Sequence, residues 1–281
     1  MTSLFRPRVL PRSLARPARA ARPARSTRAP WAWALAGALA GALPALAAFA
    51  PAQWLAGGVA RSSGGQLQLA QARGTVWTGS AQLVLTGGAA SQDIAALPGR
   101  VGWRVRPTWT GLRADVHAAC CTAVPLQLRA RPRWGGAHLA LADGQSQWPA
   151  AVLAGLGTPW NTLQPQGQLL LRTTGLQADW AAGRLVLAGQ AQLDALAMSS
   201  RLSTLRPMGS YRFALQGGEV PTLTLQTLEG SLQLSGSGQW VGQRLRFAGE
   251  ASAAPEREAA LANLLNIIGR RSGARSIITL G

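Results

Sequence analysis

The chain has 281 residues and a formal net charge of +18, and all 28 of its basic residues are arginine. This uniform choice is typical of genome-wide codon bias, and no basic stripe interleaved with aromatic residues accompanies it. The charge therefore does not indicate a nucleic-acid partner. About 220 residues follow Arg61, enough for one large domain or two small ones with real cores.

Residues 1–30 predict a disordered tail on the cytoplasmic side of a membrane. Eight arginines alternate with proline and alanine, and the first acidic residue of the chain is Asp93. The prolines would interrupt any helix in this segment. A basic segment that precedes an apolar one stays in the cytoplasm by the positive-inside rule. Nucleic-acid binding is the alternative for such a tail, but the adjacent apolar segment explains the charge more simply.

Residues 31–50 predict a transmembrane helix. The segment carries no charge, and about 20 apolar residues in a helix span roughly 30 Å, the thickness of a bilayer's hydrocarbon core. Trp31, Trp33 and Trp54 suit the two membrane interfaces. A cleaved signal peptide is the alternative, because residues 48–50 have the small-x-small form of a cleavage site. The length of the segment and the proline that follows it favour an uncleaved anchor.

Gly37 and Gly41 form a small-xxx-small pair inside this segment. Such a pair lets a second transmembrane helix approach closely. The pattern also arises by chance in a segment so rich in alanine and glycine, so helix–helix association through these glycines is only a weak prediction.

Residues 51–281 predict a domain of antiparallel β-strands on the far side of the membrane. Polar and apolar residues alternate in short segments between glycine-rich or proline-containing breaks, as in strands with one face in water. The clearest of these segments are residues 66–69, 100–106, 126–131, 211–216, 223–226, 231–234 and 244–247. Most arginines of the domain fall on the polar side of these strands, which predicts a solvated face.

An internal repeat indicates how the strands are arranged. Residues 180–191 recur as residues 240–251; each copy begins with tryptophan, has Arg-Leu four residues later and follows a glycine-led apolar strand. Trp134 marks a fainter third copy. Such hairpins cannot bury their apolar faces singly, so they predict one curved sheet with a continuous apolar face. Whether that face is an open groove for a lipid or partner strand, or a closed core, is left open by the sequence.

A short amphipathic helix is predicted near the end of the chain. Pro255 suits its first position, and Glu258 suits the positive end of the helix dipole. Leucine and isoleucine then recur at helical spacing until Gly269, which is a stop signal. Residues 276–280 predict one last strand.

The residues do not predict an enzyme, and no catalytic, cofactor-binding or metal-binding residue is expected. The two histidines, His117 and His138, do not have the spacing of metal ligands, and the sequence pattern of a nucleophile elbow is missing. Cys120 and Cys121 are adjacent. An oxidising compartment would permit a disulfide, but the strained ring it requires favours two free thiols.

Several blocks together resemble the type II secretion system protein N (general secretion pathway protein N) family. The resemblance runs from the predicted span to the end of the chain and departs in the arginine-rich tail and in the cysteine pair. The blocks are residues 74–81, 97–104, 155–167 with Asn161-Thr162-Leu163-Gln164-Pro165, 202–212 with Gly209-Ser210-Tyr211, and 264–271. Two of them suggest turns: Asn161 and Thr162 would satisfy backbone groups between two prolines, and Gly209 and Ser210 would lead into the strand at Tyr211.

The resemblance implies a single-pass protein of the bacterial inner membrane with a periplasmic domain. Such a protein is an accessory component of the machine that exports folded proteins across the outer membrane. It is expected to act through contacts with other inner-membrane and periplasmic secretion components, and the family offers no catalytic residue. A fainter resemblance to AsmA-like envelope proteins implies the alternative, in which an apolar groove of the sheet handles lipid or lipoprotein.

Overall fold

The computed structural model describes residues 31–88, 91–181, 184–242 and 244–281. The predicted cytoplasmic tail lies outside these residues. The described residues fall into two units that are divided between residues 45 and 46, and each is described by itself.

Helix α1 (Trp31–Ala48) is long and apolar enough to cross a membrane, and none of its residues is buried. It has 18 residues and no charge, and Pro44 lies inside it. A side chain added at Gly37 or Gly41 would meet no atom within 4 Å. The glycine surface therefore has room for a second helix, and the association itself stays a prediction.

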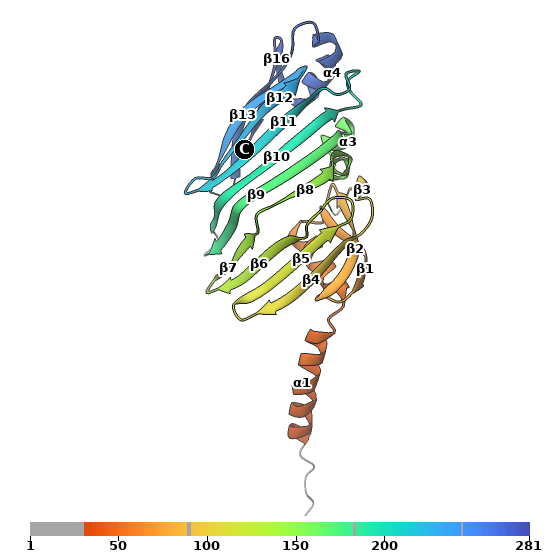
Figure 1. Cartoon of the computed structure of the whole chain (residues 1–281), viewed down its shortest axis with the longest axis vertical. Coiled ribbons are helices and arrows are strands. Elements are labelled where there is room, and N and C mark those ends of the chain that lie inside the picture. The colour runs from red at the N-terminus through yellow and green to blue at the C-terminus, as the bar shows by residue number, and fades with distance from the viewer. Residues whose placement is uncertain (1–30, 89–90, 182–183, 243) are drawn as a thin grey trace, which may run out of the picture. The chain divides into compact units, whose positions relative to one another are not determined.

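The second unit contains a 16-stranded antiparallel sheet and four short helical segments (Figure 1). The strands are β1 (Leu67–Gly74), β2 (Thr78–Thr86), β3 (Ile94–Ala96), β4 (Val101–Thr108), β5 (Gly111–Ala118), β6 (Leu126–Arg133), β7 (Gly136–Leu141), β8 (Gly144–Pro149), β9 (Gln166–Ala181), β10 (Arg184–Ser199), β11 (Gly209–Gly218), β12 (Thr222–Gly230), β13 (Leu232–Val241), β14 (Arg244–Ala253), β15 (Arg270–Ser272) and β16 (Arg275–Leu280). The helical segments are α2 (Ala52–Ser62), the 3-10 helix η1 (Ala150–Leu156), α3 (Trp160–Leu163) and α4 (Glu258–Ile268).

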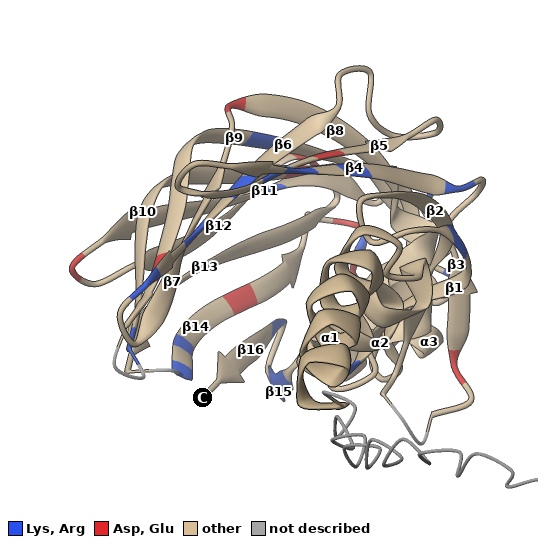
Figure 2. Ribbon diagram, turned by 90° about the horizontal axis from the view of Figure 1, so that it is seen from below, with Lys and Arg blue, Asp and Glu red and all other residues tan. Residues whose placement is uncertain are grey.

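Neighbours in the sheet are mostly neighbours in the chain. The order is β1-β2-β4-β5-β6-β7-β9-β10-β11-β12-β13-β14-β16-β15, with β3 paired to β2 and β8 paired to β9. Strands make up 56% of the structure, which confirms the predicted antiparallel, mainly β architecture. The sheet is strongly curved, and helices α2 and α3 lie inside its arc (Figure 2). We call the side that faces these helices the inner face.

The two copies of the repeat are equivalent hairpins, as predicted. Trp180 is the next-to-last residue of β9 and pairs with Leu185, and Trp240 has the same place in β13 and pairs with Leu245. The prediction of a third copy at Trp134 was wrong. Trp134 lies in the turn between β6 and β7, where Arg133 pairs with Gly136, and not within a strand.

The C-terminal helix exists but begins later than predicted. Pro255 lies in a turn, because the left-handed backbone of Glu256 (φ 65°) prevents a helix from passing through it. Helix α4 therefore begins at Glu258 and ends at Ile268, with Gly269 following as predicted. The predicted last strand is β16. Helices α2, η1 and α3 were not predicted, because the domain was interpreted mainly from the alternation of polar and apolar residues, which indicates strands.

Candidate functional site: an uncovered apolar band

Cross-strand pairs place apolar residues in rows across the inner face. One row runs through Leu112, Ala130, Leu139, Ala178 and Leu187 on β5, β6, β7, β9 and β10. A second row runs through Leu215, Leu223, Gly238, Phe247 and Leu280 on β11, β12, β13, β14 and β16. The predicted continuous apolar face is therefore present.

Helices cover the inner face at one end of the strands. Leu261, Leu264 and Leu265 of α4 are fully buried and pack into a core that includes Tyr211 and Phe247. Val152 of η1 closes a second cluster, with the residues Leu97, Val101, Ala118 and Cys121. At this end the inner face is a closed core. Ala52 of α2 closes a third cluster, with Ala81 and Trp103, beside the loop between β1 and β2 at the other end of the strands.

Toward the hairpin turns that follow β4, β6 and β9 the inner face is uncovered. Leu112, Leu128, Leu139, Trp180 and Leu185 have exposed fractions of 43%, 40%, 49%, 46% and 43%. We call these five residues the apolar band. Scattered apolar residues on a surface need no explanation, but a contiguous exposed patch marks a site of interaction. The structure thus has both of the arrangements that the sequence left open: a closed core where helices cover the inner face, and an uncovered band toward these three turns.

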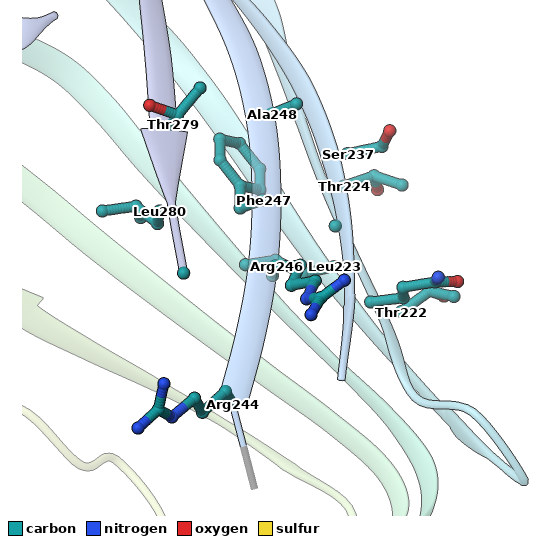
Figure 3. A pocket seen from close by; sticks show the side chains of 13 residues that line it. Thr222, Leu223, Thr224, Ser237, Arg244, Arg246, Phe247, Ala248, Thr279 and Leu280 are labelled. Carbon is teal, nitrogen blue, oxygen red and sulfur yellow. The ribbon is translucent and has the colours of Figure 1, made fainter. Parts of the chain in front are cut away.

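A hollow of about 780 Å³ lies on β12, β13, β14 and β16 (Figure 3). Its apolar lining includes Leu223, Phe247 and Leu280, which belong to the second row of the inner face. Arg244 and Arg246 contribute guanidinium groups to its margin. The volume is that of a small-molecule site, but the hollow is open to solvent, so it favours a shallow contact over enclosure.

The outer face is polar and holds one buried charge. Asp194 on β10 is only 3% exposed. Its carboxylate accepts hydrogen bonds from Arg212 (Nε 2.7 Å, Nη2 3.0 Å), Gln192 (Nε2 2.9 Å) and Arg172 (Nη1 3.1 Å). The hydrogen bond from Arg212 is the main reason that the pKa of Asp194 lies below its ordinary value. The same bond raises the pKa of Arg212. This arrangement joins β9, β10 and β11, so its role is to hold the three strands together.

A comparison with known protein families shows the family of the chain. The family described as type II secretion system (T2SS), protein N matches residues 65–278. The chain belongs to this family. The match begins before β1 and ends within β16, so it includes the apolar band and the closed core. No curated protein and no solved structure matches the chain.

The block 155–167 of this T2SS protein N chain forms a tether and not the self-contained turn that was predicted. Asn161 donates a hydrogen bond from Nδ2 to Oδ2 of Asp93 at 3.0 Å, and Thr162 donates to Oδ1 of Asn161 at 3.2 Å. The side chains thus bind each other and a distant carboxylate rather than backbone groups. The block connects α3 to the segment before β3.

In the block 202–212, Gly209 and Ser210 were predicted to form a turn before the strand at Tyr211, and this was wrong. Gly209 and Ser210 are the first two residues of β11. The Ser210 hydroxyl accepts from the backbone N–H of Ala197 at 3.0 Å and donates to Oε1 of Glu229 at 3.0 Å. Ser210 therefore ties β11 to the strands on both sides. Burial of Tyr211 in the core raises the pKa of its hydroxyl.

The block 74–81 shapes the loop between β1 and β2. Gly74 has a φ of +89°, and a Cβ there would lie 2.5 Å from the carbonyl oxygen of Thr78, so only glycine fits. The loop is held by Nε1 of Trp103, which donates to the carbonyls of Thr75 (3.2 Å) and Val76 (3.1 Å). These shared residues therefore build the sheet at one of its ends.

Cys120 and Cys121 form a disulfide, so the expectation of two free thiols was wrong. They lie in the loop after β5. Cys121 is 5% exposed and packs with Leu97 and Val101, whereas Cys120 is exposed. The loop is fixed by the backbone bond from Gln147 to the Cys121 carbonyl at 2.8 Å. A bonded pair in a fixed loop is consistent with the oxidising compartment considered above.

The two histidines lie on different strands of the outer face. His117 is exposed on β5, with its ring against Gly102. His138 Nδ1 lies 2.8 Å from Oδ1 of Asp179, which also accepts from Nη1 of Arg133 at 3.1 Å. Residues 138 and 179 are far apart in sequence, so only the pairing of β7 with β9 reveals this contact. Among the described residues no group of three potential metal ligands occurs.

Proposed function

We propose that this T2SS protein N chain is an accessory component anchored in the bacterial inner membrane. Residues 1–30 would be cytoplasmic, residues 31–50 would cross the membrane, and residues 51–281 would act in the periplasm through contacts with other secretion components. The observation that carries the proposal is the family match from residue 65 to residue 278. Helix α1, the one helix of the described residues that is long and apolar enough to cross a membrane, supports the anchoring.

Confinement to the membrane gives the anchor a role in this proposal. A tethered domain meets membrane-bound partners at a raised effective concentration, which can increase apparent affinity by a factor of about 10² or more. A version of the chain exported without residues 1–50 should therefore support less secretion than the full chain at equal periplasmic levels. Full activity of this soluble domain would contradict the role of confinement.

The apolar band supports a second candidate, in which the sheet holds an acyl chain of a lipid or lipoprotein. Its five side chains lie side by side on an uncovered face and bring no charge to it. Burying such a surface releases roughly 25 cal/mol for each Å² removed from water. An acyl chain and an apolar partner segment both provide that burial, so chemistry at the band decides between them.

Photo-crosslinking in cells tests both candidates at once. A photoreactive phenylalanine analogue at Leu139, which is 49% exposed in the band, is compared with the same analogue at Arg129 on the outer face. Crosslinks from position 139 to another secretion component support contact through the band. Crosslinks that dissolve in organic solvent support acyl-chain binding. If position 139 gives no product beyond that of position 129, the band is not a binding site.

A further inference from the structure

The hairpin turns at one end of the sheet form a surface that exposes tryptophan, valine and arginine side chains. The turns after β4, β6, β11 and β13 all lie at this end, because each strand pairs antiparallel with the next (Figure 1). The loop between β1 and β2 is there too, since Thr78 pairs with Arg104 near the end of β4. We call this end the turn edge and define it by residues 75–77, Trp109, Trp134, Val220 and Val241.

The turn edge exposes large apolar side chains that the core does not use. Trp109 and Trp134 are completely exposed, at 106% and 103%, and Val220 and Val241 are 53% and 45% exposed. Tryptophan at the tip of a turn gains nothing from packing within the fold. Its amphipathic ring is favoured at the boundary between lipid and water, where the indole N–H meets headgroups and the ring meets acyl chains.

The turn edge is also basic. The exposed arginines on and beside it are Arg106, Arg131, Arg184, Arg244 and Arg246. None of these five forms an ion pair with any described residue. The nearby carboxylates of Asp115 and Asp179 are already paired with Arg113 and Arg133, which leaves Glu219 as the acid of the β11–β12 turn. Unpaired arginines attract anionic lipid headgroups.

The chain enters the second unit at the turn edge. The backbone N–H of Val76 donates to the carbonyl of Ala50 at 2.9 Å, so the chain enters the second unit at this edge. Ala50 follows closely on the end of α1 at Ala48, with Phe49 between them. If α1 crosses the bilayer, the link between the lipid and the turn edge is too short to hold the edge far from the surface.

We infer that the turn edge docks on a bilayer surface that carries anionic lipid headgroups. The tryptophans enter the interface, and the arginines contact phosphate groups. The apolar band begins directly behind this edge, so docking would place the band next to the acyl chains. The inference rests on the proposed membrane anchoring, and the experiment distinguishes a failure of the anchoring from a failure of the docking.

The test uses the full chain in vesicles with a nitroxide label on a single introduced cysteine. Thr110→Cys places the label in the β4–β5 turn, and Thr204→Cys places it at an exposed position of the loop between β10 and β11, at the other end of the strands. Cys120 and Cys121 do not take the label because they are bonded. The vesicles contain phosphatidylcholine with or without phosphatidylglycerol, and the accessibility of the label to a water-soluble and to a lipid-soluble relaxant is measured.

Flotation of the vesicles first shows whether the chain is anchored, and failure there removes the anchoring proposal alone. In floated vesicles, the label at position 110 should be several-fold less accessible to the water-soluble relaxant than that at position 204. Adding phosphatidylglycerol should enlarge the difference, and salt should reduce it. Equal accessibility at both positions overturns the inference. So does protection at position 110 that arises only when another secretion component is added, because the edge would then bind protein.

The side chains themselves are tested by a matched pair of variants. Trp109→Ser with Trp134→Ser should abolish the protection at position 110. Val124→Ser should leave it unchanged, because Val124 is an equally isolated apolar residue (67% exposed) at the opposite end of β5. Unchanged thermal unfolding of both variants shows that the fold is intact. Retained protection in the tryptophan variant overturns the inference.

Discussion

Nδ2 of Asn161 lies 3.0 Å from Oδ2 of Asp93, although 68 residues separate the two in sequence. The contact joins the short helix α3 to the segment that leads into β3, across the part of the inner face that η1 covers. A shared block of the family is thereby explained by a tertiary hydrogen bond. Its contribution should be measurable as stability rather than as binding.

Asn161→Ala should lower the free energy of unfolding by about 1–2 kcal/mol, because the half-buried carboxylate of Asp93 loses a hydrogen-bond donor. Chemical denaturation measures the change. Gln92→Ala, at an exposed neighbouring position, serves as the control and should change little. If the two variants are equally stable, the tether has no energetic role.

Asp194→Asn should destabilise the protein by about 2–3 kcal/mol at pH 7, since hydrogen bonds to a charged group are lost. The pKa of Asp194 is lowered in the folded state. The carboxylate therefore contributes its full stabilisation at pH values above the pKa of an aspartate in the unfolded chain, about 4. This stabilisation is lost as the pH falls through the lower pKa that Asp194 has in the folded state. The difference between wild type and variant should thus shrink in acid.

Denaturation curves at a series of pH values test this dependence. Glu250→Gln is the control, because the pair between Arg275 and Glu250 is exposed and should contribute less than about 1 kcal/mol. A difference between wild type and Asp194→Asn that stays constant from neutral pH down to about pH 2, well below the ordinary pKa of an aspartate, would show that the carboxylate charge is not what stabilises the three strands.

Trp103→Ala should cost about 3–5 kcal/mol, because Trp103 is 6% exposed and fills the core beneath α2. Trp180→Ala should cost clearly less, since Trp180 is 46% exposed. The midpoints of thermal unfolding compare the two. The reverse order would mean that the apolar band is buried in solution, which would remove it as a candidate site.

Alanine at His117, at His138, or at both Cys120 and Cys121 should leave secretion intact. An accessory component acts through a surface, so no single polar side chain should be indispensable. Secretion assays at matched protein levels test this. Replacing both cysteines by serine should destabilise the fold more than replacing both by alanine, because a hydroxyl would enter the apolar site of Cys121. Lost secretion in a stable, correctly localised alanine variant would point to chemistry or redox control.

A reporter that works only in the periplasm should be active when fused after Gly281. The arginines before α1 are expected to hold the start of the chain in the cytoplasm. A silent periplasmic reporter together with an active cytoplasmic one would reverse the topology. Release of the domain into the soluble periplasmic fraction would show that residues 31–50 act as a cleaved signal.

The alternation of residues was enough to predict the strands, their antiparallel pairing and the apolar inner face, because a period of two has only one structural interpretation over so many segments. The Trp180 and Trp240 hairpins followed from the same pattern. Trp134 is not part of this repeat, because it lies in the turn between β6 and β7, whereas Trp180 and Trp240 lie within strands. The sequence could not tell how far α2, η1 and α4 would cover the inner face, because that depends on packing between distant segments.

The contacts of the outer face were beyond prediction for a different reason. Asp194 meets Arg172 and Arg212 only when three strands align in register, and His138 meets Asp179 in the same way. Charge alternation along one strand gives no sign of which side chains will be buried. The disulfide was not predicted, because the sequence shows that a ring between adjacent cysteines is strained but does not show that the loop around Cys121 is fixed.

The near-coincidence of sheet order with chain order has a consequence for how the protein is made. A polypeptide emerging on the far side of a membrane, beginning with β1, can add each new hairpin to the strands already formed, so assembly need not wait for the last residue. Every intermediate would present a fresh unpaired strand to the solvent. The finished molecule ends this growth at β15, three residues long with Arg270 and Arg271, a short and charged margin on which another chain does not readily pair.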